Sequence, residues 1–292
     1  MRALVLMLAL ALTGAGMGRP LVIGHRGARS VAPENTLAAA RAAAELGADG
    51  WEFDVQRTKD GALVLMHDEV LTRTTNAREA FPDRSPWRVS DFTLEEIQGL
   101  DAGSWFVQTD PFGTIASGEV PPARAEAFRG ERVPTLREAL LLSQELGLWV
   151  NIELKGAPLA SVTPARRATV EDVAALVREL AMVDRVLVSS FDHEMIRRLK
   201  AIAPEVRGAL LTVALPADTL SYLVRTGADA VNPQHTAYTA EWGRKLGSAG
   251  YGVYVWTVNE PGDLGRLAQD PSVTGIITDW PQRLRALLRD RG

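Results

Sequence analysis

Short strand-like runs alternate with amphipathic helical stretches along most of this chain. The apolar positions Val170, Val173, Ala174, Val177 and Leu180 fall at i, i+3, i+4, i+7 and i+10, which places them on one face of a helix. Eight βα units in succession predict a closed (β/α)8 TIM barrel rather than an open sheet. The eight strand-like runs are residues 21–24, 50–56, 149–154, 186–190, 208–213, 230–232, 252–258 and 275–278.

The length and composition fit one catalytic domain. The chain has 292 residues, of which 46% are hydrophobic and 23% are charged, so a single barrel domain over residues 19–292 is expected. The net charge is −4, and the basic residues are scattered rather than gathered in a stripe, so no nucleic-acid partner is expected. The absence of cysteine excludes disulfides and thiolate chemistry. The oligomeric state stays open.

Residues 1–18 have the layout of a signal peptide. A short basic start precedes an apolar run at 3–13, and small residues follow up to Gly18. The apolar run is well short of the ~20 residues that cross a bilayer, so no stable membrane span is expected. We therefore expect export to the periplasm or secretion. A wrongly assigned start codon ahead of a cytoplasmic enzyme remains the alternative.

One long segment interrupts the βα pattern. Residues 72–132 are rich in proline, glycine, tryptophan and charge, and about sixty residues far exceed an ordinary connection. We expect this insertion to lie over the mouth of the barrel. It either shapes the substrate pocket or serves as a structural flap, and both possibilities stay open.

Four residues mark expected helix boundaries. Asn35 and Asp192 each precede a helical pattern, and their side chains can accept hydrogen bonds from free amide groups, so both are predicted N-caps. Gly47 and Gly227 follow helical patterns and suit a left-handed helix end.

Two carboxylates share a face of the second strand. Because side chains alternate along a strand, Glu52 and Asp54 point to one side, and Trp51, Phe53 and Val55 point to the other. The apolar set is expected to pack on helices, which leaves the carboxylates in the barrel lumen. Two adjacent carboxylates repel each other unless a cation or a proton compensates them.

A third carboxylate comes from the third strand. The same alternation turns Asn151, Glu153 and Lys155 inward. Three carboxylates without thiolates or a histidine cluster favour a hard divalent cation, Mg2+ or Ca2+. The alternative is a buried ion network in which Lys155, Arg26 and Arg57 neutralise the carboxylates.

Two histidines are expected on the same rim. His25 and Arg26 directly follow the first strand. The turn at 59–61 predicts a hairpin above the rim, and counting back from that turn places His67 opposite Asp54. An imidazole pair beside a metal cluster favours acid-base catalysis by His25 and His67.

Several motifs in order identify a family. The pattern resembles the glycerophosphodiester phosphodiesterase family over residues 21–284, and residues 110–113 resemble its longer, exported members. The motifs are GHRG at 24–27, PENT at 33–36, EFDV at 52–55, HD at 67–68, RTT at 73–75 and NIELK at 151–155.

The resemblance implies an activity and a role for each site residue. It implies metal-dependent hydrolysis of glycerophosphodiesters, such as glycerophosphocholine and glycerophosphoethanolamine, to sn-glycerol 3-phosphate and an alcohol, with one Ca2+ or Mg2+ ion. The roles it implies are metal binding by Glu52, Asp54 and Glu153, acid-base catalysis by His25 and His67, and phosphate binding by Arg26 and Lys155.

Two tryptophans and two further histidines are assigned from their positions along the chain. Trp256 ends the seventh strand and either holds the glycerol carbons or packs in the core, whereas Trp280 is expected to pack. His193 and His235 are expected to be structural.

Three rival functions remain open on sequence alone. The first is a lysophospholipase D or a phospholipase C-like lipase, because residues 72–132 carry several aromatic side chains. The second is a non-enzymatic phosphodiester-binding protein. The third is a glycosidase that uses Glu52 and Glu153, although this leaves the two rim histidines unexplained. The head group, the choice of metal, the attacking oxygen and the assignment of base and acid also stay open.

Overall fold

The computed structural model describes residues 18–156 and 163–289, and within them the strands close into a barrel. The strand order is β1-β9-β8-β7-β6-β5-β4-β2, and pairing of β1 with β2 closes the ring. All of these pairings are parallel, so the predicted barrel is confirmed. The strands are β1 (Leu21–His25), β2 (Gly50–Arg57), β4 (Trp149–Leu154), β5 (Val186–Ser190), β6 (Arg207–Thr212), β7 (Ala230–Pro233), β8 (Gly252–Val255) and β9 (Gly275–Thr278).

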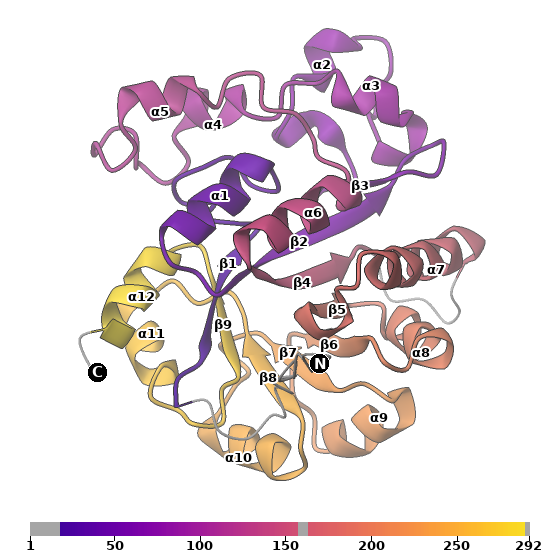
Figure 1. The fold of residues 1–292 in the computed structure, drawn as a ribbon, viewed down its shortest axis with the longest axis vertical. Coiled ribbons are helices and arrows are strands. Elements are labelled where there is room, and N and C mark those ends of the chain that lie inside the picture. The colour runs from indigo at the N-terminus through magenta and orange to yellow at the C-terminus, as the bar shows by residue number, and fades with distance from the viewer. Residues whose placement is uncertain (1–17, 157–162, 290–292) are drawn as a thin grey trace, which may run out of the picture.

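Helices surround this barrel on the outside (Figure 1). Val170, Val173, Ala174 and Val177 are all buried, as their spacing predicts. The helices are α1 (Leu37–Glu45), α6 (Leu136–Leu146), α7 (Pro164–Glu179), α8 (His193–Ile202), α9 (Thr219–Thr226), α10 (Ala240–Ser248), α11 (Pro261–Leu267) and α12 (Pro281–Arg289), with a 3-10 turn η3 (Val183–Arg185) before β5.

The strand expected at 252–258 is shorter in the structure. β8 ends at Val255, and beyond it the pairing with β7 is reduced to one bridge between Gln234 and Trp256. The Trp256 indole donates a hydrogen bond to the carbonyl of Asn232 at 2.7 Å. Trp256 therefore lies just beyond the regular ladder and is joined to β7 by its side chain.

The lumen is apolar at its base and polar at its carboxyl end. Trp149 and Tyr254 stack with ring centroids 5.3 Å apart, and they belong to a buried cluster of inward-facing side chains. On the outer face of β2, Trp51 and Phe53 are fully buried in the main core. The apolar base leaves the carboxyl ends of the strands as the place where polar groups gather.

One predicted helix cap is wrong. Thr36, not Asn35, is the N-cap of α1, and its side chain accepts a hydrogen bond from Ala39 N. Asn35 has a φ of 58°, and its side-chain amide donates to Asp54 Oδ2 at 2.8 Å. The Asn35 side chain is therefore directed to a carboxylate of β2 and does not reach the free amide groups of the helix.

The other predicted boundaries are confirmed. Asp192 caps α8 by accepting a hydrogen bond from Glu194 N. Gly47 and Gly227 have φ values of 78° and 70°, the left-handed conformation that ends a helix readily only at glycine.

The predicted hairpin forms, but its register differs from the expected one. β3 (Leu63–Leu65) pairs antiparallel with β2, with Val55 opposite Leu65. Met66 N donates to Asp54 O at 3.0 Å, so Met66 lies opposite Asp54 and His67 lies one residue further on. The loop closes with Thr58 N bonded to Ala62 O, and this closure fixes the register.

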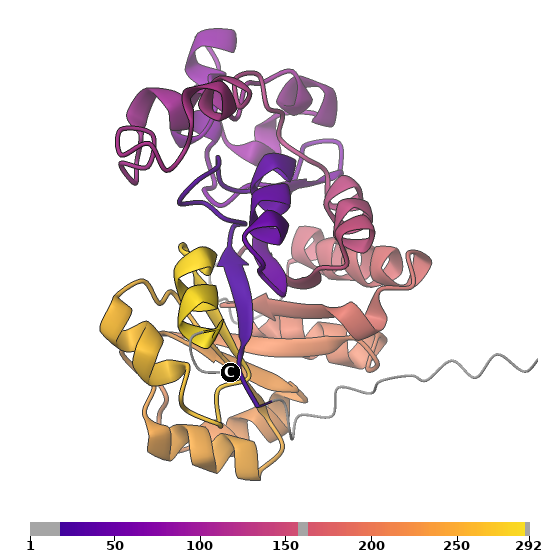
Figure 2. The same cartoon turned by 60° about the vertical axis from the view of Figure 1, so that its left-hand side comes forward.

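Residues 66–135, which we call the β3–α6 segment, contain short helices, and the first part of the segment has a buried cluster apart from the barrel core. Figures 1 and 2 show these helices gathered at one end of the molecule, beside α1. The two ends of the segment meet, because Val64 and Thr135 form a bridge and Leu65 N bonds to Pro134 O at 2.9 Å. The cluster includes Met66, Leu71, Val89, Phe92, Ile97 and Leu100. The helices are η1 (Leu71–Arg73), α2 (Ala77–Ala80), η2 (Val89–Asp91), α3 (Leu94–Gln98), α4 (Ser104–Thr109) and α5 (Pro122–Glu126).

The expected signal peptide falls almost wholly outside the described residues, which begin at residue 18. No helix in the described part of the chain is long and apolar enough to span a membrane.

Candidate active site

A cavity of about 120 Å³ opens at the carboxyl end of the barrel. Every predicted site residue except Asp54 lines it, and Asp54 contacts the lining residue Lys155. The lining residues are His25, Arg26, Glu52, His67, Asn151, Glu153, Lys155, Ser189, Phe191, Leu211, Trp256, Thr257 and Ile277.

The structure brings the three predicted carboxylates together. One oxygen from each of Glu52, Asp54 and Glu153 lies within 4.8 Å of the others. The register explains this proximity, because Asp54 of β2 is directly paired with Glu153 of β4. Glu52 and Asp54 are 4% and 1% exposed, so their charges are almost fully removed from water.

The electrostatics of the cluster fit a cation. Burial and the charges of Asp54 and Glu153 raise the pKa of Glu52, and burial with Asp54 raises the pKa of Glu153 to about 7. Burial also opposes ionisation of Asp54, but Lys155 and Arg26 lower its pKa. A buried set of repelling carboxylate oxygens is the donor set that Mg2+ or Ca2+ prefers, and a cation would relieve the repulsion.

Lys155 and Arg26 are the cations closest to this cluster. Lys155 Nζ lies 2.7 Å from Glu153 Oε1 and 3.2 Å from Asp54 Oδ1. Arg26 Nε lies 3.5 Å from Asp54 Oδ2. Arg57, the third cation of the alternative ion network, pairs instead with Asp172 on α7. The network therefore contains two of the three expected cations.

The backbone of Arg26 has an unusual conformation that serves the site. Its φ is 55°, and its backbone N–H donates to Glu52 Oε2 at 2.9 Å. Its guanidinium donates to Glu34 Oε1 at 2.8 Å. Arg26 is thus held from both ends beside the cavity.

His25 is bonded to a carboxylate that the sequence did not assign. Its Nδ1 lies 2.7 Å from Asp279 Oδ1, and Asp279 Oδ2 accepts a hydrogen bond from Asn259 Nδ2 at 2.7 Å. Burial and the neighbouring Arg26 lower the pKa of His25. A hydrogen bond from Nδ1–H to the carboxylate leaves Nε2 free to exchange a proton in the cavity. The position of Asp279 directly after the last strand was the available sequence signal.

His67 has a similar partner in the next residue. Its Nδ1 lies 2.7 Å from Asp68 Oδ1, and Arg73 Nε donates to Asp68 Oδ2 at 2.6 Å. Arg73 also bonds to Glu34 at 2.7 Å, the carboxylate that holds Arg26. Burial lowers the pKa of His67 as well. The two histidines thus have matching carboxylate partners, although they come from different elements.

Trp256 lines the cavity together with Phe191, and their rings meet at 5.6 Å in an edge-to-face contact. Trp280 lies against Phe112 with centroids 5.7 Å apart, and Arg283 lies over its ring. Trp280 therefore packs, as expected, while Trp256 contributes to the cavity wall.

The other two histidines do not line this cavity. His193 Nε2 lies 2.8 Å from Leu211 O and its Nδ1 lies 3.2 Å from Tyr222 OH, which agrees with the expected structural role. The backbone N–H of His235 donates to Trp256 O at 2.7 Å.

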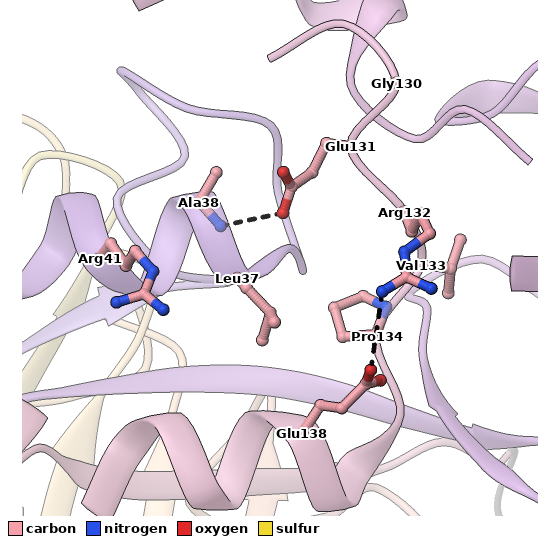
Figure 3. A pocket seen from close by; sticks show the side chains of 9 residues that line it. All are labelled: Leu37, Ala38, Arg41, Gly130, Glu131, Arg132, Val133, Pro134 and Glu138. Atoms are coloured by element: carbon pink, nitrogen blue, oxygen red, sulfur yellow. Dashed lines mark hydrogen bonds and ion pairs between the residues drawn. The ribbon is translucent and has the colours of Figure 1, made fainter. Parts of the chain in front are cut away.

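A larger hollow of about 400 Å³ lies on the outside of the barrel and contains none of the predicted site residues. Figure 3 shows it between α1, the end of the β3–α6 segment and the start of α6. Glu131 extends across it and accepts a hydrogen bond from Ala38 N at 3.2 Å. This contact joins the segment to the first turn of α1.

Comparison with known proteins identifies the family. The model of the glycerophosphoryl diester phosphodiesterase family matches residues 25–283. The chain belongs to this family. Membership confirms the family and the enzyme class that the ordered motifs predicted.

Relatives and solved structures of this family agree over nearly the whole chain. A glycerophosphodiester phosphodiesterase of Caldanaerobacter subterraneus is 37% identical over 94% of this chain and 100% of its own length. A glycerophosphodiester phosphodiesterase of Bacillus subtilis is 32% identical over 90% of this chain and 84% of its own length. The structure of an Oleispira antarctica phosphodiesterase in complex with the product sn-glycerol-3-phosphate has a TM-score of 0.77 and 26% identity, and covers 93% of this chain and 97% of its own.

Proposed function

We propose that this chain hydrolyses glycerophosphodiesters to sn-glycerol 3-phosphate and an alcohol, with one Mg2+ or Ca2+ ion and with His25 and His67 as the acid-base pair. The observation that carries the proposal is the meeting of three carboxylates and two histidines at one cavity. The product bound to the Oleispira antarctica phosphodiesterase supports the choice of substrate class.

Glu52, Asp54 and Glu153 would hold the cation. Their oxygens are close enough to share one ion, and carboxylate oxygens suit a hard cation. When bound, the ion would act as a Lewis acid that draws charge from a phosphate oxygen.

Arg26 and Lys155 would bind the phosphodiester. Both line the cavity, and their guanidinium and ammonium groups attract the anionic phosphate and the charge that develops on its oxygens during displacement. Burial opposes the charge on both groups, but neighbouring carboxylates raise their pKa values. Asp54 and Glu34 raise the pKa of Arg26, and Asp54 and Glu153 raise the pKa of Lys155. Both therefore remain cationic at neutral pH.

His25 and His67 would transfer the protons. One takes a proton from the attacking oxygen, and the other gives a proton to the departing alkoxide. Their lowered pKa values favour a neutral imidazole near pH 7, which suits the base. The histidine that acts as the acid has to take up a proton first, and its carboxylate partner stabilises the imidazolium that forms.

The test is an assay of the purified protein without residues 1–18. We expect release of sn-glycerol 3-phosphate from glycerophosphocholine, loss of activity with EDTA, and recovery with added Mg2+ or Ca2+. His25→Ala and His67→Ala should each lower kcat by about 100- to 10,000-fold, because each removes a proton-transfer group. His193→Gln is the matched control, since His193 does not line the cavity, and it should stay within a few-fold of the wild type.

The possible outcomes distinguish the rival functions. Binding of the diester without turnover would identify a phosphodiester-binding protein. Faster release of choline from lysophosphatidylcholine than from glycerophosphocholine would identify a lysophospholipase D. Activity that resists EDTA would contradict the metal-dependent reaction.

We further propose that residues 1–18 direct export and that the insertion at 72–132 shapes the substrate pocket. The apolar run at 3–13 supports export, and Arg73 supports the second proposal, because it bonds to Asp68, the partner of His67, and to Glu34, the partner of Arg26. Expression with and without residues 1–18, followed by fractionation, tests export. Cytoplasmic retention of the full chain would contradict it.

A further inference from the structure

We propose that Ser189 and Asn151 bind the hydroxyl groups of the substrate's glycerol moiety. This inference rests on the proposed function, because it assigns one end of a glycerophosphodiester to one wall of the cavity. Both residues line the cavity, and the proposed chemistry uses neither of them.

Both residues lie next to the carboxylate cluster. In the parallel register, Asn151 of β4 pairs with Glu52 of β2, and Ser189 of β5 pairs with Glu153 of β4. Ser189 is therefore level with Glu153, and Asn151 is level with Glu52, deeper in the lumen. A phosphodiester bound at the carboxylates would have the carbons next to its phosphorus beside these two residues.

Both side chains carry a buried polar atom without a protein partner. Within residues 18–156 and 163–289, Ser189 Oγ and Asn151 Oδ1 make no hydrogen bond, although the two residues are 0% and 1% exposed. Buried polar groups in folded proteins are nearly always hydrogen-bonded, so a pair of unpaired atoms at a cavity indicates a polar ligand or water.

The neighbouring Ser190 shows that a serine side chain on β5 can be hydrogen-bonded within the protein. Ser190 faces away from the lumen, and its hydroxyl donates to Leu154 O at 2.8 Å and accepts from Asp192 N at 3.0 Å. The two successive serines on β5 therefore differ in their hydrogen bonding. Ser190 is paired within the protein, whereas Ser189 is paired with nothing in the described residues and lines the cavity.

An apolar part of the wall complements the carbon chain of glycerol. Phe191 directly follows β5, Leu211 lies on β6 and Trp256 directly follows β8, and all three line the cavity. A three-carbon chain with two hydroxyls on one side and CH groups on the other matches such a wall. A choline head group has no hydroxyl to offer Ser189 or Asn151, so these residues favour the glycerol end over the alcohol end.

A binding experiment tests this inference independently of turnover. Calorimetry would compare sn-glycerol 3-phosphate with n-propyl phosphate, which lacks both hydroxyls, on the full protein with Mg2+ or Ca2+. We expect the wild type to bind sn-glycerol 3-phosphate about tenfold or more tightly than n-propyl phosphate. Ser189→Ala and Asn151→Ala should each reduce this preference several-fold or more, and leave the affinity for n-propyl phosphate unchanged.

The control variant is Ser190→Ala. It removes a hydroxyl from the adjacent residue and should lower the melting temperature, because paired backbone groups lose their partner. It should keep the ligand preference. Ser189→Ala should keep the melting temperature of the wild type, because no bond within the described chain is lost.

Three results would overturn the inference: equal binding of the two ligands to the wild type, equal weakening of both by Ser189→Ala, or no binding of sn-glycerol 3-phosphate. The glycerophosphocholine assay judges the proposed function separately. A wild type that binds sn-glycerol 3-phosphate selectively without hydrolysing glycerophosphocholine would retain the inference and refute the reaction.

Discussion

At the scale of single residues, the site consists of ionisable groups whose partners fix their states. Asp279 and Asp68 each accept a hydrogen bond at 2.7 Å from the Nδ1 of a histidine. Each carboxylate has a different second hydrogen-bond donor. Asn259 donates to Asp279, and Arg73 donates to Asp68. The orientation of each imidazole therefore depends on residues outside the cavity lining.

Asp279→Asn should lower kcat on glycerophosphocholine by about 10- to 1,000-fold with little change in KM. An asparagine keeps the shape, but its NH2 group and neutral oxygen no longer stabilise the imidazolium or select one tautomer. Steady-state kinetics measures the effect. Asp263→Asn on α11, where Asp263 pairs only with Arg266 among the described residues, is the matched control. An unchanged kcat would refute a positioning role for Asp279.

Strand alternation was enough to predict which carboxylates meet. Glu52, Asp54 and Glu153 follow from the period of two along β2 and β4, because the apolar residues between them have to face the helices. Asp279 and Ser189 could not be assigned in this way. Their roles depend on side-chain hydrogen bonds, made or missing, between strands far apart in sequence, and spacing does not reveal such bonds.

At the scale of elements, the first part of the β3–α6 segment has an apolar cluster apart from the barrel core, whereas Phe106, Val120, Ala125 and Phe128 of the same segment pack in the barrel core. Helix and strand periodicity predicted the barrel elements because each buries one regular face. The cap of α1 and the hairpin register, which was expected to place His67 opposite Asp54, were predicted wrongly, although His67 does line the cavity. Both depend on local geometry, namely the inward turn of Asn35 and the length of the hairpin loop, which hydrophobic patterns do not specify.

Phe92→Ala should destabilise the β3–α6 segment more than the barrel. Phe92 is fully buried, and truncation of a buried phenylalanine costs about 3–5 kcal/mol. Hydrogen exchange should increase over residues 66–102, which form the Phe92 cluster, while β5 to β8 stay protected. Leu141→Ala on α6, at a position that is 46% exposed, is the control. A uniform rise in exchange over the whole barrel would mean that the segment does not open separately.

Asp49 should make the base of the barrel sensitive to acid. Its carboxylate accepts hydrogen bonds from Val22 N at 2.8 Å and from Arg19 at 3.1 Å, and it pairs with Arg285 at 2.8 Å. Burial opposes ionisation, but these contacts lower the pKa of Asp49 below its usual value. A lowered folded-state pKa stabilises the protein above the unfolded-state value of about 3.9, and this contribution is lost as the pH falls further.

Asp49→Asn should therefore lower the free energy of unfolding by about 1–3 kcal/mol at pH 7. The difference from the wild type should shrink below about pH 4, because the wild-type carboxylate then becomes protonated as well. Denaturant unfolding at pH 7 and at pH 3 measures this. A difference that does not change with pH would show that the charge of Asp49 contributes nothing.

At the scale of the whole molecule, the pairing of the first strand, β1, with the last strand, β9, brings the two ends of the fold to one site. His25 comes from the first strand and Asp279 follows the last one. The order of βα units predicted this closure, and closure explains why residues more than 250 positions apart are hydrogen-bonded.

Mg2+ or Ca2+ should stabilise the whole fold. A cation would relieve the repulsion that raises the pKa of Glu52 and Glu153, and a ligand at 100 times its Kd adds about 2.7 kcal/mol to the free energy of unfolding. Thermal unfolding with EDTA and with added metal measures the shift. Glu153→Gln should reduce this shift strongly, and an equal shift in that variant would place the ion elsewhere.

The bridge between Val64 and Thr135 gives the β3–α6 segment the character of an exchangeable cassette. Its two ends are tied together beside β2, so its length and sequence can diverge without moving the strands that hold the carboxylates. The segment also carries His67, Asp68 and Arg73. A chimera that receives the corresponding cassette from a relative should therefore keep the proposed phosphodiester chemistry only if these three residues are retained, and the rest of the cassette can then change the substrates that it admits.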